Sequence, residues 1–125
     1  MVRRVDALIF RTANLHAVVA FYRAIGIPLS EETDPRSPAL FACNLGGTML
    51  AISEVAPEQA PDQHLTSSAT IGFRVDSVEK AFLAAKAAGA WIVREPQDLP
   101  WGRRAIVLDP DGRPVEFSER RAESA

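Results

Sequence analysis

Two stretches of the chain decide the fold: FRTANLHAVVAFYRAIG at residues 10–26 and FRVDSVEKAFLAAKAAG at residues 73–89. They align without a gap at an offset of 63 residues, and both begin with Phe-Arg and end with Gly. Similarity at a fixed offset indicates that one structural unit occurs twice. We therefore expect two copies of a single module.

The first copy reads as a strand, a helix cap, a helix and a stop. Apolar and β-branched residues from Ala7 to Thr12 predict the strand, and Asn14 is a common N-cap residue type. Gly26 suits the left-handed position that ends a helix. The helix itself is predicted by apolar residues at helical spacing, namely Leu15, Val18, Val19, Tyr22 and Ile25.

The second copy repeats this order. Thr70 to Val75 is predicted to be a strand, Ser77 an N-cap and Gly89 the stop. Trp91 directly follows this stop and is expected in the core. The apolar stripe of the second helix consists of Val78, Ala81, Phe82, Ala85 and Ala88.

Short strands follow each helix. Gly46-Gly47 and Asp109-Pro110-Asp111-Gly112 are strong turn signals. Strands are predicted at 40–45, 48–54, 91–94, 104–108 and 114–118, with polar loops at 30–38 and 95–102. The order is βαβββ twice, an α+β fold. The predicted modules span 1–56 and 69–119, with a linker at 57–68 and a tail at 120–125.

Composition excludes several classes of partner. The 14 Lys and Arg against 16 Asp and Glu give a net charge of −2, whereas a nucleic-acid-binding protein has a basic excess. No apolar run reaches the roughly 18 residues of a membrane span. The single cysteine, Cys43, cannot form an internal disulfide, which favours the reducing cytoplasm. We expect a cytoplasmic protein with no nucleic-acid or membrane partner.

Together with the repeat, three sets of motifs resemble the vicinal oxygen chelate superfamily, which includes glyoxalase I, extradiol dioxygenases, and bleomycin- and fosfomycin-resistance proteins. The motifs are Asn14-Leu15 with Phe21-Tyr22 and Gly26; Phe73-Arg74-Val75 leading to Gly89; and Trp101-Gly102 before Asp109-Pro110-Asp111-Gly112 and Val115-Glu116-Phe117. The resemblance implies that the sheets of the two modules combine into a cup for a small molecule. It also implies a homodimer.

Enzymes of this family hold a divalent metal with His, Gln or Glu from the first and fourth strands of each module. The corresponding positions here are Ala7, Ala51, Thr70 and Glu116. Only Glu116 is a competent ligand, and a transition-metal site needs several converging donors. We therefore expect neither a metal nor another cofactor.

Three nearby donors do not rescue this metal site. A one-residue shift along a strand turns a side chain to the other face, which excludes Asp6. His16 lies in the first helical turn and is expected to face solvent, and His64 lies in the predicted linker.

The resemblance implies that alternate strand residues face the cup. The predicted ligand-binding residues are Ala7, Ile9, Arg11, Phe41, Met49, Ala51, Thr70, Gly72, Arg74, Trp101, Arg103 and Glu116. Trp101 and Phe41 are candidates for stacking, although Phe41 fits the core equally well. Either Arg103 or Arg104 is expected to pair with an anionic or carbonyl group of the ligand.

These residues favour a metal-free binding protein resembling the bleomycin-resistance proteins, one that sequesters a hydrophobic or antibiotic-like ligand. The alternative is a glyoxalase- or dioxygenase-like lyase or isomerase that uses Glu116 with unrecognised partners. A third hypothesis is an accessory domain that acts through its dimer surface.

Overall fold

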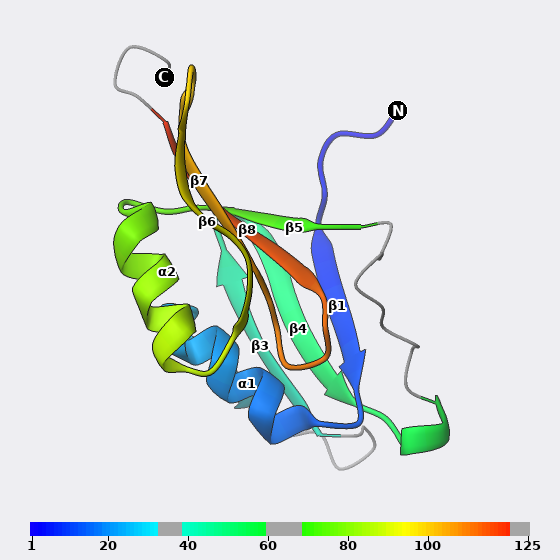
Figure 1. Ribbon diagram of the computed structural model, residues 1–125. Coiled ribbons are helices and arrows are strands. Elements are labelled where there is room, and N and C mark those ends of the chain that lie inside the picture. The colour runs from blue at the N-terminus through cyan, green and yellow to red at the C-terminus, as the bar shows by residue number, and fades with distance from the viewer. Residues whose placement is uncertain (33–38, 60–68, 121–125) are drawn as a thin grey trace. The chain divides into compact units, whose positions relative to one another are not determined.

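The computed structural model describes residues 1–32, 39–59 and 69–120, and the chain divides into two compact units at residues 62 and 63 (Figure 1). Each unit contains one helix and one four-stranded sheet. Of the predicted linker at 57–68 and tail at 120–125, residues 60–68 and 121–125 lie outside the described residues, as does His64. Among the described helices, none is long and apolar enough to cross a membrane.

Unit 1 has the predicted βαβββ order. Its elements are β1 (Ala7–Thr12), α1 (Leu15–Ala24), β2 (Ser30–Glu32), β3 (Leu40–Leu45) and β4 (Thr48–Glu54), followed by a single 3-10 turn, η1 (Pro57–Gln59). The strand order is β1-β4-β3-β2, with β1 parallel to β4 and the other pairs antiparallel. The predicted loop at 30–38 is wrong for Ser30 to Glu32, which form an exposed edge strand without any apolar alternation.

Unit 2 repeats the same topology. Its elements are β5 (Ile71–Arg74), α2 (Val78–Ala87), β6 (Trp91–Leu99), β7 (Gly102–Leu108) and β8 (Pro114–Arg120), in the sheet order β5-β8-β7-β6. The predicted end of β6 at Arg94 is wrong, because the strand continues through Pro96 to Leu99 with two register shifts. An edge strand tolerates a proline, since the missing N–H has no partner strand to reach.

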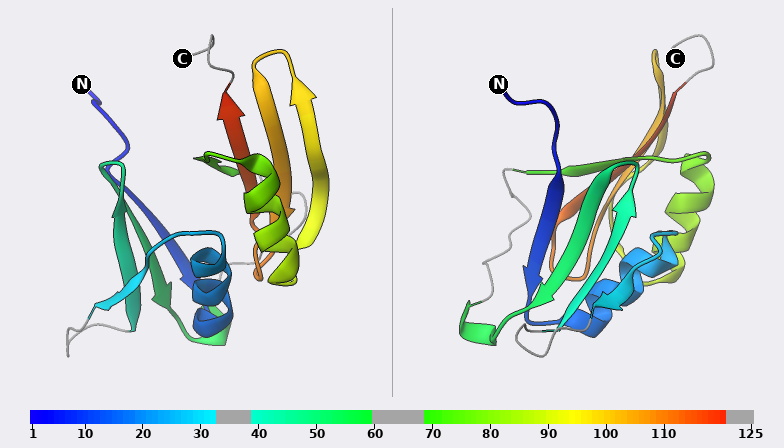
Figure 2. Two further views of the ribbon diagram at one scale, coloured as in Figure 1. Left: turned by 90° about the vertical axis from the view of Figure 1, so that its left-hand side faces the viewer. Right: turned by 180° about the vertical axis from the view of Figure 1, so that it is seen from behind.

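Each helix covers one face of the sheet in its own unit (Figure 2). Four of the five predicted stripe residues of α1, Leu15, Val18, Val19 and Tyr22, are buried, and Phe21 is buried with them, whereas Ile25 is the half-buried C-cap residue. Val78, Ala81, Phe82 and Ala85 of α2 are likewise buried, whereas Ala88 is exposed. The prediction that Trp91 lies in the core is wrong, because 68% of its surface is exposed at the start of the edge strand β6.

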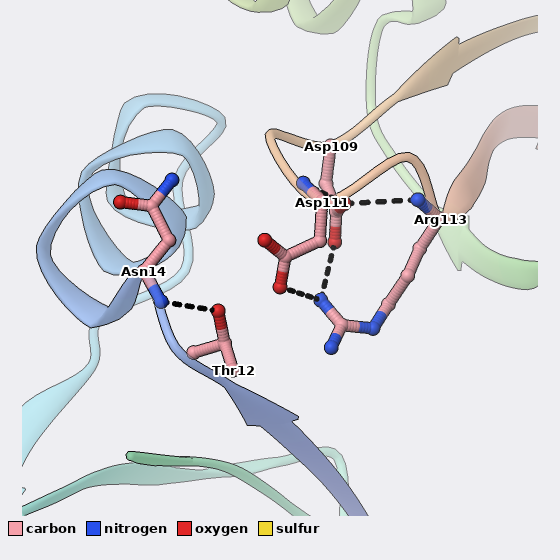
Figure 3. Close-up of polar contacts among 5 residues, drawn as sticks. All are labelled: Thr12, Asn14, Asp109, Asp111 and Arg113. Carbon is pink, nitrogen blue, oxygen red and sulfur yellow. Dashed lines mark hydrogen bonds and ion pairs between the residues drawn. The ribbon is translucent and has the colours of Figure 1, made fainter. Parts of the chain in front are cut away.

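The two helices begin differently. Ser77 caps α2 as predicted, since its hydroxyl accepts a hydrogen bond from the backbone N–H of Lys80 at 3.1 Å. Asn14 occupies the N-cap position of α1, but its side chain makes no capping bond. Instead, the backbone N–H of Asn14 donates to the hydroxyl of buried Thr12 at 2.8 Å (Figure 3).

Both predicted turns are present. Gly46 and Gly47 have positive φ angles of 61° and 95°, as a tight hairpin requires. In the turn from β7 to β8, the carboxylate of Asp109 is fully buried and accepts hydrogen bonds from the backbone N–H groups of Asp111 and Arg113. The Arg113 guanidinium bridges Asp109 and Asp111 at 3.1 Å from each (Figure 3). The buried Asp109 carboxylate and the Arg113 guanidinium therefore stabilise this turn.

Candidate functional site

In each unit, one sheet face packs on the helix and the other points away from it. We call the second surface the open face of that unit. In β1, the ring of Phe10 lies 5.7 Å from the ring of Tyr22 on α1, so Phe10 belongs to the helix-covered face. Because side chains alternate along a strand, Ala7, Ile9 and Arg11 lie on the open face.

The open face of unit 1 consists mostly of small and apolar residues. The register places Ile9 beside Ala51 and Ala7 beside Met49. Ile9 and Met49 are among the exposed large hydrophobic residues, whereas Ala51 is buried. Ala42 lies on the far side of Ala51 and extends this small-residue surface. The described chain thus presents an apolar strip where metal-binding relatives would carry donor side chains.

Phe41 does not belong to this strip. It lies in register with Ile52, which is completely buried, and its ring contacts the Arg23 guanidinium of α1 at 5.1 Å. Both contacts place it on the helix-covered face. The prediction that Phe41 faces the ligand is therefore wrong, and its place in the core agrees with the alternative interpretation of the sequence.

The open face of unit 2 is charged. Gly72 lies in register with Glu116, and a side chain at Gly72 would touch the Glu116 carboxylate at 3.8 Å. One row further along, Arg74 lies in register with Ser118, which is paired on its other side with Arg104. The predicted residues Gly72, Arg74 and Glu116 therefore share one face. Thr70 is exposed and directly precedes β5.

Arg104 and Glu116 form an ion pair on this open face. Nη1 of Arg104 lies 3.5 Å from Oε1 of Glu116, and each side chain is about 30% exposed. This distance is longer than the roughly 2.7–2.9 Å of a strong charge-assisted hydrogen bond. Nε of Arg104 is buried and has no hydrogen-bond partner among the described residues. Glu116 therefore satisfies the Arg104 guanidinium only in part.

Arg103 points the other way, so the prediction that it faces the ligand is wrong. Its guanidinium pairs with Asp98 at 2.8 Å and with Glu79 of α2 at 3.2 Å. The hydrogen bond to Asp98, and to a smaller extent the hydrogen bond to Glu79, raises the pKa of Arg103. The sequence left Arg103 and Arg104 as alternatives, and strand alternation assigns Arg104 to the open face.

Trp101 lies at the tip of the β6–β7 hairpin, where the Arg120 guanidinium lies 4.6 Å from the centre of its ring. Gly102 is essential to this geometry, because a Cβ there would collide with the backbone carbonyl of Glu119. Neither Arg120 nor Glu119 was predicted to have a role. The Glu119 carboxylate accepts a hydrogen bond from the backbone N–H of Val78, which places a negative charge at the start of α2.

The positions that would hold a metal do not fit one. Ala7 and Ala51 offer only methyl groups, Thr70 offers a hydroxyl, and the Glu116 carboxylate is paired with Arg104. Within 1–32, 39–59 and 69–120, no group of three or more His, Cys, Asp or Glu side chains could hold an ion. This donor set cannot replace the nitrogen and carboxylate ligands that a divalent transition metal requires.

Cys43 belongs to no cluster of His, Cys, Asp or Glu side chains within the described residues. It lies in register with Leu50 on the helix-covered face of unit 1, and burial raises the pKa of its thiol. A raised pKa keeps the thiol protonated and poorly nucleophilic. Cys43 is thus a half-buried residue at the edge of the core.

The sheets and helices define the class of the protein: it consists of two βαβββ modules, each with one strand face left uncovered by its helix. A sequence model described as the Glyoxalase/Bleomycin resistance protein/Dioxygenase superfamily matches residues 4–117. The chain belongs to this superfamily, as its motifs indicated.

Individual relatives agree with this assignment. An uncharacterized protein of Mycolicibacterium smegmatis is 27% identical over 113 residues, which is 90% of each chain. An antibiotic binding protein from Streptomyces sp. CB03234 matches at a TM-score of 0.69 and 19% identity, over 96% of this chain and 98% of its own. The fosfomycin resistance protein FosX from Listeria monocytogenes matches at a TM-score of 0.74 and 18% identity, over 99% of this chain and 98% of its own. At these sequence identities the two solved structures show a shared fold, and they do not identify a ligand for this chain.

Proposed function

We propose that this protein binds a hydrophobic or antibiotic-like small molecule without a metal, in the manner of the bleomycin-resistance branch of the superfamily. The observation that carries the proposal is the donor set at the family's metal positions, where two alanines and a threonine accompany a single paired carboxylate. A site without metal ligands still binds well when apolar surface is combined with a few polar anchors. The two open faces offer both kinds of surface.

Further support comes from what occupies the open faces. Exposed Ile9 and Met49 provide apolar contact area in unit 1, and Arg104 and Trp101 provide polar and aromatic contacts in unit 2. An antibiotic binding protein is among the structures with this fold. The homodimer and the cytoplasmic location are parts of the same proposal.

The enzymatic alternative gains no support from the described residues. A glyoxalase- or dioxygenase-like reaction would require Glu116 as a metal ligand or base, with converging partners. Glu116 forms an ion pair with Arg104, and no cluster of metal-binding side chains surrounds it in the described ranges. The proposal therefore places Glu116 among the ligand-facing residues without a catalytic role.

Calorimetric titration with a panel of aromatic antibiotics tests the proposal. We expect at least one compound to bind with the same affinity in buffer containing EDTA and in buffer containing added divalent metal. Mass spectrometry after prolonged incubation should recover that compound unmodified. Failure of every compound to bind, loss of binding in EDTA, or turnover of the ligand would contradict the proposal.

A further inference from the structure

Three arginines form a strip on the open face of unit 2. Arg74 and Arg104 flank Ser118 in one row of the sheet, and Arg120 lies two residues further along the same strand as Ser118. We call Arg74, Arg104 and Arg120, with Ser118 between them, the arginine strip. Arg74 is exposed and has no ion-pair partner among the described residues. The strip therefore carries more positive charge than the single carboxylate of Glu116 offsets.

Arg104 is the least satisfied member of the strip. A guanidinium has five N–H donors arranged in a plane. Glu116 approaches one terminal nitrogen at 3.5 Å, while Nε is buried and unpaired within the described chain. An acceptor supplied from outside the protein would meet the exposed part of the side chain, about 30% of its surface, where the 3.5 Å contact leaves the guanidinium only partly satisfied.

An aromatic ring lies at the Arg120 end of the strip. Trp101 and Arg120 are stacked at 4.6 Å, and Arg120 is one side-chain step, roughly 7 Å, along β8 from Ser118. A flat ring placed against Trp101 would thus have its substituents within reach of the strip. Indole and guanidinium surfaces are both good stacking partners for a planar ligand.

We propose that the arginine strip is an oxyanion subsite of the ligand-binding face. It receives a carboxylate or a comparable oxyanion borne on an aromatic ligand, whose ring packs against Trp101. This inference rests on the proposed function and narrows it to aromatic acids. Glu116 positions the Arg104 guanidinium through their ion pair. Because Glu116 also competes with the ligand's oxyanion for this guanidinium, it lowers the affinity of the strip for the ligand.

The test uses naphthalene carboxylate, the neutral naphthalene carboxamide of the same shape, and inorganic phosphate. Binding is followed by proton–nitrogen correlation spectra of the whole chain, in which the indole N–H of Trp101 is assigned by comparison with Trp91→Phe. We expect the carboxylate to bind about tenfold more tightly than the carboxamide, as a charge-assisted hydrogen bond predicts. Phosphate, which has no ring, should bind more weakly than the carboxylate.

Three variants identify the group responsible. Arg104→Gln should reduce the preference for carboxylate over carboxamide to about twofold or less. Arg103→Gln is the matched control, since it removes the neighbouring guanidinium from the opposite face and should leave the preference unchanged. Glu116→Gln should increase carboxylate affinity, because it removes the competing charge. A merely structural role for the Arg104–Glu116 pair would weaken binding in both variants.

Equal binding of carboxylate and carboxamide would overturn the inference while leaving the proposed function intact. Phosphate binding as tight as that of the carboxylate would overturn it too, since the strip would then hold any anion. The same follows if the carboxylate fails to bind, or if Arg103→Gln and Arg104→Gln lose equal affinity. The antibiotic panel tests the proposed function separately, in the absence of these probes.

Discussion

The two units share one topology but carry different chemistry on their open faces. At matching positions, unit 1 has Ala7 and Ala51 where unit 2 has Thr70 and Glu116. The helix-covered faces, by contrast, contribute mainly apolar buried side chains in both units. The buried face maintains the fold, and the open face is therefore free to diverge. A function must accordingly be argued from the open faces, since the fold is shared by proteins of many functions.

The connections between the last two strands of each unit differ in the same way. In unit 1, the Asn44 side chain accepts one hydrogen bond from Gly47 at an exposed position. In unit 2, Asp109 is buried beneath three hydrogen-bond donors from Asp111 and Arg113. The turn between the last two strands is thus stabilised by one solvent-exposed hydrogen bond in unit 1 and by a buried ion pair in unit 2.

The largest predicted difference lies between these two turns. Asp109→Ala leaves the largely buried Arg113 without this partner and should lower the free energy of unfolding by about 3 kcal/mol. Asn44→Ala removes a single exposed hydrogen bond and should cost about 0.5 kcal/mol. Chemical denaturation of both variants measures the contrast. Equal losses would show that burial does not distinguish the turns.

A smaller contrast is expected between the two helix starts. Ser77→Ala removes the hydroxyl that caps α2 and should cost about 1 kcal/mol. Asn14→Ala should cost only a few tenths of a kcal/mol, roughly the level of an ordinary surface change, because the Asn14 side chain makes no capping bond. Thermal unfolding monitored by circular dichroism compares the pair. A larger loss for Asn14→Ala would mean that its side chain does stabilise α1.

Thiol labelling of the whole chain reports on unit 1 specifically, because Cys43 is the single cysteine of the chain. Burial raises the pKa of this thiol above its ordinary value. The folded state therefore favours the protonated thiol, and this small stabilisation is lost as the pH rises through the raised pKa. We expect the rate of thiol labelling to reach half its maximum at a higher pH in the folded protein than in the denatured chain. Identical pH profiles would show that Cys43 is not shielded.

Periodicity and turn chemistry allowed most of the fold to be predicted. The stripes of α1 and α2 and the stops at Gly26 and Gly89 are local signals, and the structure confirms them except at the last stripe residues, Ile25 and Ala88. The edge strands β2 and β6 were missed in whole or in part, because exposed Ser30 to Glu32 lack alternation and Pro96 suggested a loop. Edge strands are defined by their partners, which a local pattern does not reveal.

The candidate site was only partly predictable, for a related reason. Strand parity correctly grouped Ala7, Ile9 and Arg11 on one face of β1. It could not choose between Arg103 and Arg104, since both are basic neighbours in one strand and the choice depends on Glu79 of α2. The contact of Arg120 with Trp101 links residues distant in sequence, so no local pattern predicts it.

Elemental analysis of tag-free protein tests the metal-free account most directly. The protein would be incubated with excess nickel, zinc, manganese or iron(II), desalted and compared with Glu116→Ala treated in the same way. We predict no stoichiometric metal in either protein, because Ala7 and Ala51 supply no donors. About one metal per chain, lost in Glu116→Ala, would contradict the account and make the enzymatic alternative the leading hypothesis.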